Sequence, residues 1–271
     1  MGQTPAWGCY FELRPDELTA IRSKSPAVYL PWGALEWHGP HLPLGLDGIV
    51  AEAVANRAIR RTGGVLMPTT WWPTGVLPHP ESLGVSGASL GGMLDDIFTQ
   101  LAAVGWRVAV IVSGHCGHAH ELAMIAAAER AITRHGLLAL AVSPLALVDE
   151  SMIDHAALWE TSLALALRPD LVVLDALGHA PLRPKSSAVI GHDPRDTASA
   201  SIGASALDLA TERLTTAVSE LLASNDPAPL YALYTQRRAR CQPFVERFGP
   251  DLEQATQAWW DALIQEKSAD A

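Results

Sequence analysis

An apolar run leads through a polar loop into a helical pattern within residues 27–47, which read AVYLPWGALEWHGPHLPLGLD. Residues 27–31 are apolar without polar alternation, as expected of a strand that is covered on both faces of a sheet. The residues after 47 repeat apolar side chains at three- and four-residue spacing, which is typical of an amphipathic helix. This order predicts a strand, a loop and a helix, the building unit of an α/β fold.

The same order recurs along the chain. Further apolar runs predict strands at 65–68, 107–113, 137–143 and 171–174, and helical patterns occupy 48–61, 90–104, 118–134, 157–167, 199–223 and 251–266. Strands that alternate with helices predict a single α/β domain over residues 1–271, with a mainly parallel β-sheet and helices on both faces. In such a sheet, ligands bind beyond the carboxyl ends of the strands.

The composition is that of a globular protein, since 49% of the 271 residues are hydrophobic and 18% are charged. The formal net charge of -10 disfavours nucleic acid and anionic membrane surfaces as partners. No apolar run approaches the roughly 20 residues of a membrane span, and residues 1–6 show neither a signal peptide nor a myristoylation pattern. Three cysteines are too few for a disulfide framework. We therefore expect a cytoplasmic protein.

Candidate metal ligands occur where the expected strands end. If the chain is still extended after the first run, Glu36 and His38 project to the same side, because side chains alternate along a strand. Asp47 immediately precedes a helical pattern, so we expect it to cap that helix while its second oxygen points over the strand ends. His115 follows the run at 107–113 and reaches the same edge of the sheet.

Two further candidates, His155 and Glu160, open the helix expected at 157–167 and could share one face of it. Mixed imidazole and carboxylate ligands suit zinc, manganese or iron better than calcium or magnesium. Each residue also has a plainer interpretation, as a helix cap or as a hydrogen-bonded core histidine. Position alone leaves both interpretations open; what supports a metal site is that all the candidates lie at strand ends or at the helix starts that follow.

Three segments resemble, in order, the signatures of the creatininase family of metal-dependent amidohydrolases. They are residues 33–47 (GALEWHGPHLPLGLD), 113–118 (SGHCGH) and 155–172 (HAALWETSLALALRPDLV), and a weaker similarity covers 191–210. The resemblance implies two neighbouring divalent ions, of zinc, manganese or iron, with Asp47 bridging them. It places Glu36 and His115 on one ion and His38 on the other. It also implies a homo-oligomer, often a hexamer.

The ligand that closes the second ion departs from the family pattern. A glutamate is usual two places after the residue matched by His115, but that position holds Gly117. We expect Glu160 to replace it; the alternatives are His118, His120 and Glu121. The same departure keeps open a different class of function, in which the chain binds a metal or ligand without catalysis.

The resemblance implies that the two ions activate a bridging water, whose hydroxide attacks an amide carbon. His155 matches the position of the family's proton shuttle, and we expect it to act in catalysis together with Glu160. The expected reaction is hydrolysis of a non-peptide C–N bond in a small cyclic amide or formamide. Creatinine is a poor specific candidate, because the family's substrate-loop pattern is hard to find in residues 79–90. Trimming of a short peptide and deformylation of a nucleotide-like intermediate are alternative activities.

Aromatic residues flank these segments, and the chain has nine tryptophans. The substrate-binding candidates are Trp37, Trp72, His118 and Trp159, since aromatic walls suit a flat or cyclic ligand. Core packing or a subunit interface is the alternative for each tryptophan, and it is favoured for Trp259 and Trp260. Cys116 is expected to be a small packing residue rather than a soft ligand or a reactive thiol.

Overall fold

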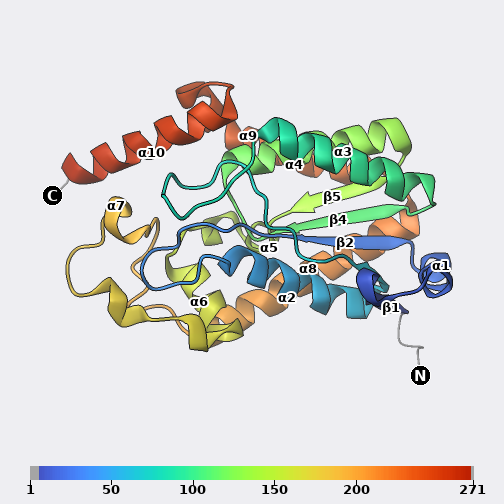
Figure 1. The fold of residues 1–271 in the computed structure, drawn as a ribbon, viewed down its shortest axis with the longest axis horizontal. Helices are drawn as coiled ribbons and strands as arrows, with labels where there is room; N and C mark the ends of the chain where they lie inside the picture. The colour runs from blue at the N-terminus through green and yellow to red at the C-terminus, as the bar shows by residue number, and fades with distance from the viewer. Residues whose placement is uncertain (1–5, 270–271) are drawn as a thin grey trace.

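The computed structural model describes residues 6–269 and places a parallel β-sheet between layers of helices (Figure 1). The strands lie in the order β1 (Trp7–Cys9), β3 (Gly64–Leu66), β2 (Ala27–Trp32), β4 (Val108–Ser113) and β5 (Leu138–Val142), and every neighbouring pair is parallel. The expected α/β class with a parallel sheet and helices on both faces is confirmed. Residues 1–5 and 270–271 lie outside the described residues. The expectation about a signal peptide, which rests mostly on residues 1–5, and the assignment of all of 1–271 to one domain therefore stay predictions.

Helices cover both faces of the sheet (Figure 1). One face carries α3 (Gly87–Ala103) and α4 (His118–His135), and the other carries α2 (Leu46–Thr62) and α8 (Ala200–Ser224), on which α6 (Leu158–Leu167) packs. Helix α9 (Ala228–Phe248) lies beside α4 and the edge strand β5. The remaining helices are α1 (Pro15–Lys24), α5 (Pro144–Val148), α7 (Pro184–Ser187) and α10 (Leu252–Ala269). In Figure 1, α10 lies on the side toward which the arrowheads of β4 and β5 point. Within residues 6–269, no helix has the length and apolar character that crossing a membrane requires.

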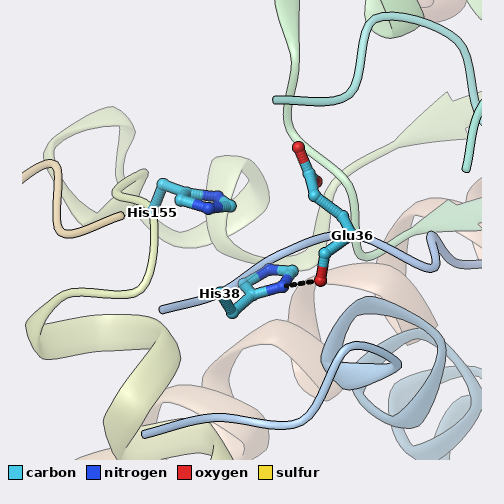
Figure 2. Close-up of side chains that lie close together, drawn as sticks. All are labelled: Glu36, His38 and His155. Atoms are coloured by element: carbon cyan, nitrogen blue, oxygen red, sulfur yellow. Dashed lines mark hydrogen bonds between the residues drawn. The ribbon is translucent and has the colours of Figure 1, made fainter. Parts of the chain in front are cut away.

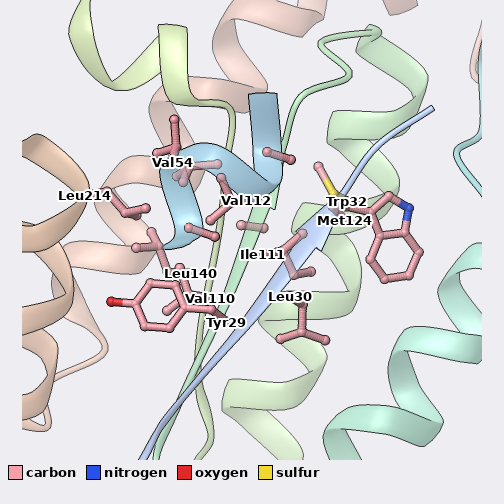
Figure 3. Packing of buried hydrophobic residues seen from close by; sticks show 14 of the residues in the cluster. Tyr29, Leu30, Trp32, Val54, Val110, Ile111, Val112, Met124, Leu140 and Leu214 are labelled. Atoms are coloured by element: carbon pink, nitrogen blue, oxygen red, sulfur yellow. The ribbon is translucent and has the colours of Figure 1, made fainter. Parts of the chain in front are cut away.

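Alternating residues of the central strands fill the two faces of the sheet (Figure 3). Tyr29 pairs in register with Val110, and both lie on the face that α2 and α8 cover. Leu30 pairs with Ile111, and both point toward Met124 of α4 on the opposite face. All five side chains are buried, and complete burial of a large apolar side chain stabilises a fold by about 1.5–3 kcal/mol. Burial on both faces explains why these strands lack polar alternation.

The prediction of a strand at 171–174 is wrong. These residues belong to two 3-10 helices, η3 (Pro169–Leu171) and η4 (Leu174–Leu177), with an exposed Val173 between them. The backbone N–H of Val173 donates to the carbonyl of His41 in a loop, so the apolar run has no strand beside it. Two further 3-10 helices are η1 (Tyr10–Glu12) and η2 (Glu150–Met152).

The sequence patterns did not predict β1, α1, α9 or the short helices α5 and α7. β1 has three residues, too short for its pattern to stand out. α1 buries only Ile21, so its apolar stripe is weak. α9 contains Pro243, a residue that normally ends a helix because it removes a backbone donor.

Candidate metal centre

Close backbone contacts fix the first turn of α2 against the ends of β2 and β4. A Cβ at Gly114 would lie 2.0 Å from the backbone oxygen of Asp47, and a Cβ at Gly33 would lie 2.3 Å from the Cα of Gly48. Only glycine permits such an approach without moving the backbone. The contact holds Asp47 above the strand ends. The expectation that Asp47 caps the helix is wrong, because it is the second residue of α2 and its side chain turns toward two histidines.

Five buried side chains meet at this edge of the sheet. Asp47 lies between the two histidines, with Oδ1 3.1 Å from His38 Nε2 and Oδ2 3.5 Å from His115 Nδ1. Glu36 Oε2 is 2.8 Å from His115 Nδ1, and Glu160 Oε2 is 3.5 Å from His38 Nε2. They therefore form two sets of three, Glu36–Asp47–His115 and His38–Asp47–Glu160. Within each set the possible ligand atoms all lie within 4.8 Å of one another, and Asp47 belongs to both.

Glu36 and His38 converge for a reason other than strand alternation. β2 ends at Trp32, and in the loop that follows His38 Nδ1 contacts the backbone oxygen of Glu36 at 2.9 Å (Figure 2). This contact leaves His38 Nε2 facing Asp47. Glu36 is fixed separately, because the backbone N–H of Leu77 donates to its Oε1 at 2.5 Å. The premise of an extended strand was wrong, although the two side chains do share one space.

The carboxyl groups and polar atoms of the cluster lie in an environment that is unfavourable for them. Burial opposes the ionisation of Asp47, but the nearby His38 holds the pKa of that carboxyl far below its usual range. Burial raises the pKa of Glu160 well above the usual value, and Asp47 adds to the effect. Glu36 Oε2, His38 Nε2 and Asp47 Oδ2 are buried and lack a hydrogen-bond partner. Unpartnered buried polar atoms are costly, and divalent cations would satisfy these nitrogen and oxygen donors.

His155 is held beside the cluster with a defined tautomer. Its Nε2 lies 3.0 Å from the carbonyl oxygen of Trp37, so this nitrogen carries the proton and donates it. Its ring stacks on His38 at 4.5 Å between centroids, as Figure 2 shows, and its Nδ1 is 3.9 Å from Glu160 Oε2. Burial, and then the charge of His38, lower the pKa of His155 to about 4. A neutral imidazole with an open Nδ1 therefore faces the clustered carboxylates.

Glu160 is anchored as part of the cluster. Its Oε2 accepts a hydrogen bond from the backbone N–H of Ala156 at 2.6 Å, and its own N–H donates to Asp154. Asp154 also accepts from the N–H of Trp159 and so fixes the first turn of α6. These bonds direct the Glu160 carboxylate toward His38.

The three alternatives to Glu160 lie outside both ligand sets. His118 stacks on Phe244, His120 Nδ1 accepts from the backbone of Thr74, and Glu121 pairs with Arg237. Position 117 itself offers no ligand, because it is glycine. A Cβ there would lie 2.8 Å from His115 Nε2, so a larger residue would require the His115 ring to move.

A cavity of about 180 Å³ opens onto the cluster. Its lining includes Glu36, His115, His155 and Glu160, and also a second set, Arg240, Phe244, Thr256 and Trp259. The volume is below the roughly 300–1,000 Å³ of drug-sized ligand sites, which favours a small substrate. The second set of residues comes from α9 and α10, which carry none of the recognisable sequence motifs.

The predicted substrate-binding residues are only partly at this cavity. His118 belongs to its lining, whereas the lining does not include Trp37, Trp72 or Trp159. Trp37 stacks on His79 at 4.3 Å, and Trp72 is 48% exposed. In the last helix Trp260 is buried, as expected from core packing, while Trp259 reaches the cavity.

Cys116 also lines the cavity, but its thiol is unreactive by its surroundings. Sγ lies 2.9 Å from Ser143 Oγ, and burial raises the pKa of the thiol strongly. A raised pKa suppresses the reactive thiolate, in agreement with a packing role. The three cysteines, all within the described residues, are free.

Comparisons with known proteins agree on one family. The sequence model described as creatininase, creatinine amidohydrolase, matches residues 12–224. A creatinine amidohydrolase of Pseudomonas putida is 32% identical over 180 residues, covering 57% of this chain and 69% of the relative. A mycofactocin precursor peptide peptidase of Mycolicibacterium smegmatis is 30% identical over 165 residues, covering 58% of this chain and 64%, less than two thirds, of the peptidase.

Solved structures show the same fold. A structure described as creatininase with manganese has a TM-score of 0.68 at 25% identity, covering 80% of this chain and 98% of its own. A creatininase variant described as the Zn–Zn type has a TM-score of 0.67 at 26% identity, covering 79% of this chain and 97% of its own.

Proposed function

The chain belongs to the creatininase family of hydrolytic enzymes, and on that basis we propose that it cleaves a non-peptide C–N bond in a small cyclic amide or formamide with the help of two divalent ions. One observation carries the proposal: two sets of three buried ligands share Asp47. The homo-oligomer that the family resemblance implies stays a prediction.

The donor atoms fit two ions. Glu36, Asp47 and His115 would hold one, and His38, Asp47 and Glu160 would hold the other. Each set offers one imidazole nitrogen and carboxylate oxygens from two residues, a mixture that zinc and manganese accept. Among the solved relatives, one is described as a Zn–Zn type and another as a manganese type.

The side chains around the ligands supply the proton path. When bound, divalent ions lower the pKa of water and polarise a carbonyl oxygen. His155 can accept a proton at Nδ1, because its Nε2–H is already committed to the Trp37 carbonyl. The same Nδ1 can then pass the proton to the departing nitrogen, which avoids expelling an amide anion. In total, one water adds across the C–N bond and yields a carboxylic acid and an amine.

A second candidate activity is removal of a residue from a short peptide. The similarity to mycofactocin precursor peptide peptidases favours it. The small cavity favours the small-molecule substrate instead, since an extended peptide would have to lie mostly outside it. A binding protein without catalysis is a third class, which Gly117 suggested. The set His38–Asp47–Glu160 offers a carboxylate from another position and argues against it.

The test combines metal analysis with a substrate panel. Protein loaded with zinc or manganese is assayed against lactams, cyclic ureides, formamides and short peptides, beside Asp47→Asn and the surface control Asp208→Asn. We expect two ions per chain, turnover of an amide, and loss of both only in Asp47→Asn. An ion-loaded protein that turns over none of the panel, or only the peptides, would overturn the proposal.

A further inference from the structure

We propose that the C-terminal helices α9 and α10 select the substrate, and that Arg240 binds a carboxylate carried by a small amide or lactam. The inference rests on the proposed function, because it names the substrate class of the same cavity. Helix α9 begins at Ala228, beyond residue 224 where the match to the family model ends. The part of the cavity lining that α9 and α10 supply therefore lies outside that match.

Arg240 has hydrogen-bonding capacity that the protein does not use. Its Nε lies 2.6 Å from Glu150 Oε2, while its Nη1 is 3.6 Å from Glu121 Oε2. Nη1 is buried and has no hydrogen-bond partner. The neighbouring Arg237 forms close contacts with both of these glutamates and so competes for their charge. The Arg240 side chain as a whole is 26% exposed and lines the cavity, and a guanidinium at a cavity wall is suited to a ligand carboxylate.

The residues around Arg240 restrict the shape of the ligand. The His118 ring stacks on Phe244 with 4.9 Å between centroids and 9° between planes, and Trp259 adds a second aromatic wall. Burial, and then the charge of Arg240, lower the pKa of His118, which keeps this ring neutral. Flat walls, one cation and the ligand cluster together fit a small planar amide whose carboxylate lies away from the bond to be cleaved.

Matched substrates separate this inference from the proposed function. Zinc-loaded protein is given dihydroorotate and dihydrouracil, which differ by one carboxylate, and N-formyl-β-alanine and N-ethylformamide, which differ in the same way. Kinetics are measured for the native chain, Arg240→Gln, Arg240→Lys and the control Arg238→Gln. Arg238 lies on the same helix but pairs with Glu129 and does not line the cavity. Binding of each probe is also followed by thermal shift, so that a preference is read even without turnover.

We expect the native chain to prefer the carboxylate-bearing member of a pair. Arg240→Gln should lower kcat/KM, or affinity, for that member by about 10- to 150-fold, the range of a hydrogen bond to a charged group. The uncharged twin should change less than about threefold. Arg240→Lys keeps the charge and should recover part of the loss, which guards against a folding defect. The inference would be refuted if the native chain showed equal kcat/KM or affinity for both members of a pair, or if Arg240→Gln lowered both values equally. Turnover without such a preference would leave the proposed hydrolase intact.

Discussion

Glu160→Gln tests the ligand that departs most from the family pattern. The substitution keeps the shape of the side chain but removes one carboxylate from the set His38–Asp47–Glu160. We expect the variant to bind one ion per chain with normal affinity and the other weakly, and to lose most of its activity. The metal-free variant should be at least as stable as the native chain, because burial raises the pKa of Glu160 and makes its ionisation costly at neutral pH.

The size of the effect follows from the ligand count. Only three residues form the set, and Glu160 is one of two carboxylates in it. Loss of a residue that merely supports a ligand lowers metal affinity by about 10- to 100-fold, so loss of a ligand should cost at least about 100-fold. That factor corresponds to about 2.8 kcal/mol. In a chain of this size it should reduce the metal-induced rise in Tm by about 5–11 °C.

The assay is metal content by mass spectrometry after dialysis against zinc, together with Tm measured with and without zinc. Glu121→Gln is the matched control, because Glu121 was an alternative ligand and its carboxylate instead pairs with Arg237. The control should keep both ions even if the lost ion pair lowers its Tm. A Glu160→Gln protein with two ions and the native metal-induced shift, or a Glu121→Gln protein with one ion, would refute the assignment.

Three further predictions concern the scaffold and the proton shuttle. Gly114→Ala should weaken zinc binding and destabilise the protein by about 1–3 kcal/mol, because its Cβ must displace the backbone at Asp47; native stability and zinc content would contradict this. Tyr234→Phe should lower the free energy of unfolding, measured by urea denaturation, by about 1–3 kcal/mol and leave the zinc content unchanged. The reason is that it leaves the carbonyl of Ala139 and the N–H of Ala141 unpaired in buried β5. The pKa of His155 falls to about 4 in the fold, so the unfolded chain binds this proton first as pH drops below about 6.5. Between pH 6.5 and 4, the free energy of unfolding of the metal-free native protein should therefore fall by up to about 3 kcal/mol more than that of His155→Gln. If the free energies of the two proteins fell in parallel with pH, the assigned shift would be disproved.

The sequence predicted the chemistry of the centre better than its geometry. The types of residue at 36, 38, 47 and 115 pointed to a metal site, and the folded chain brings all four together. The expected geometry was less accurate, because Glu36 and His38 lie in a loop beyond the end of β2 and Asp47 lies inside the helix. Residue type carries donor chemistry directly, whereas side-chain direction depends on contacts such as those at Gly33 and Gly114 that join distant segments.

The residues that α9 and α10 contribute to the cavity lining could not be predicted in the same way. Arg240 and Phe244 lie in a helix whose proline obscures its pattern, and no motif marks either residue. The apolar run at 171–174 shows the opposite error, since strand-like composition is not enough without a neighbouring strand. Both failures involve segments whose structure is decided by tertiary partners rather than by local sequence.

The division of the cavity between two stretches of chain has a practical consequence for engineering. All five clustered donors lie between residues 36 and 160, while α9 and α10 contribute to the lining but to neither ligand set. If α9 and α10 select the substrate as proposed, changes in these two helices should alter which molecule binds and leave the five clustered donors in place. Substrate preference could then be redesigned separately from the ligand residues.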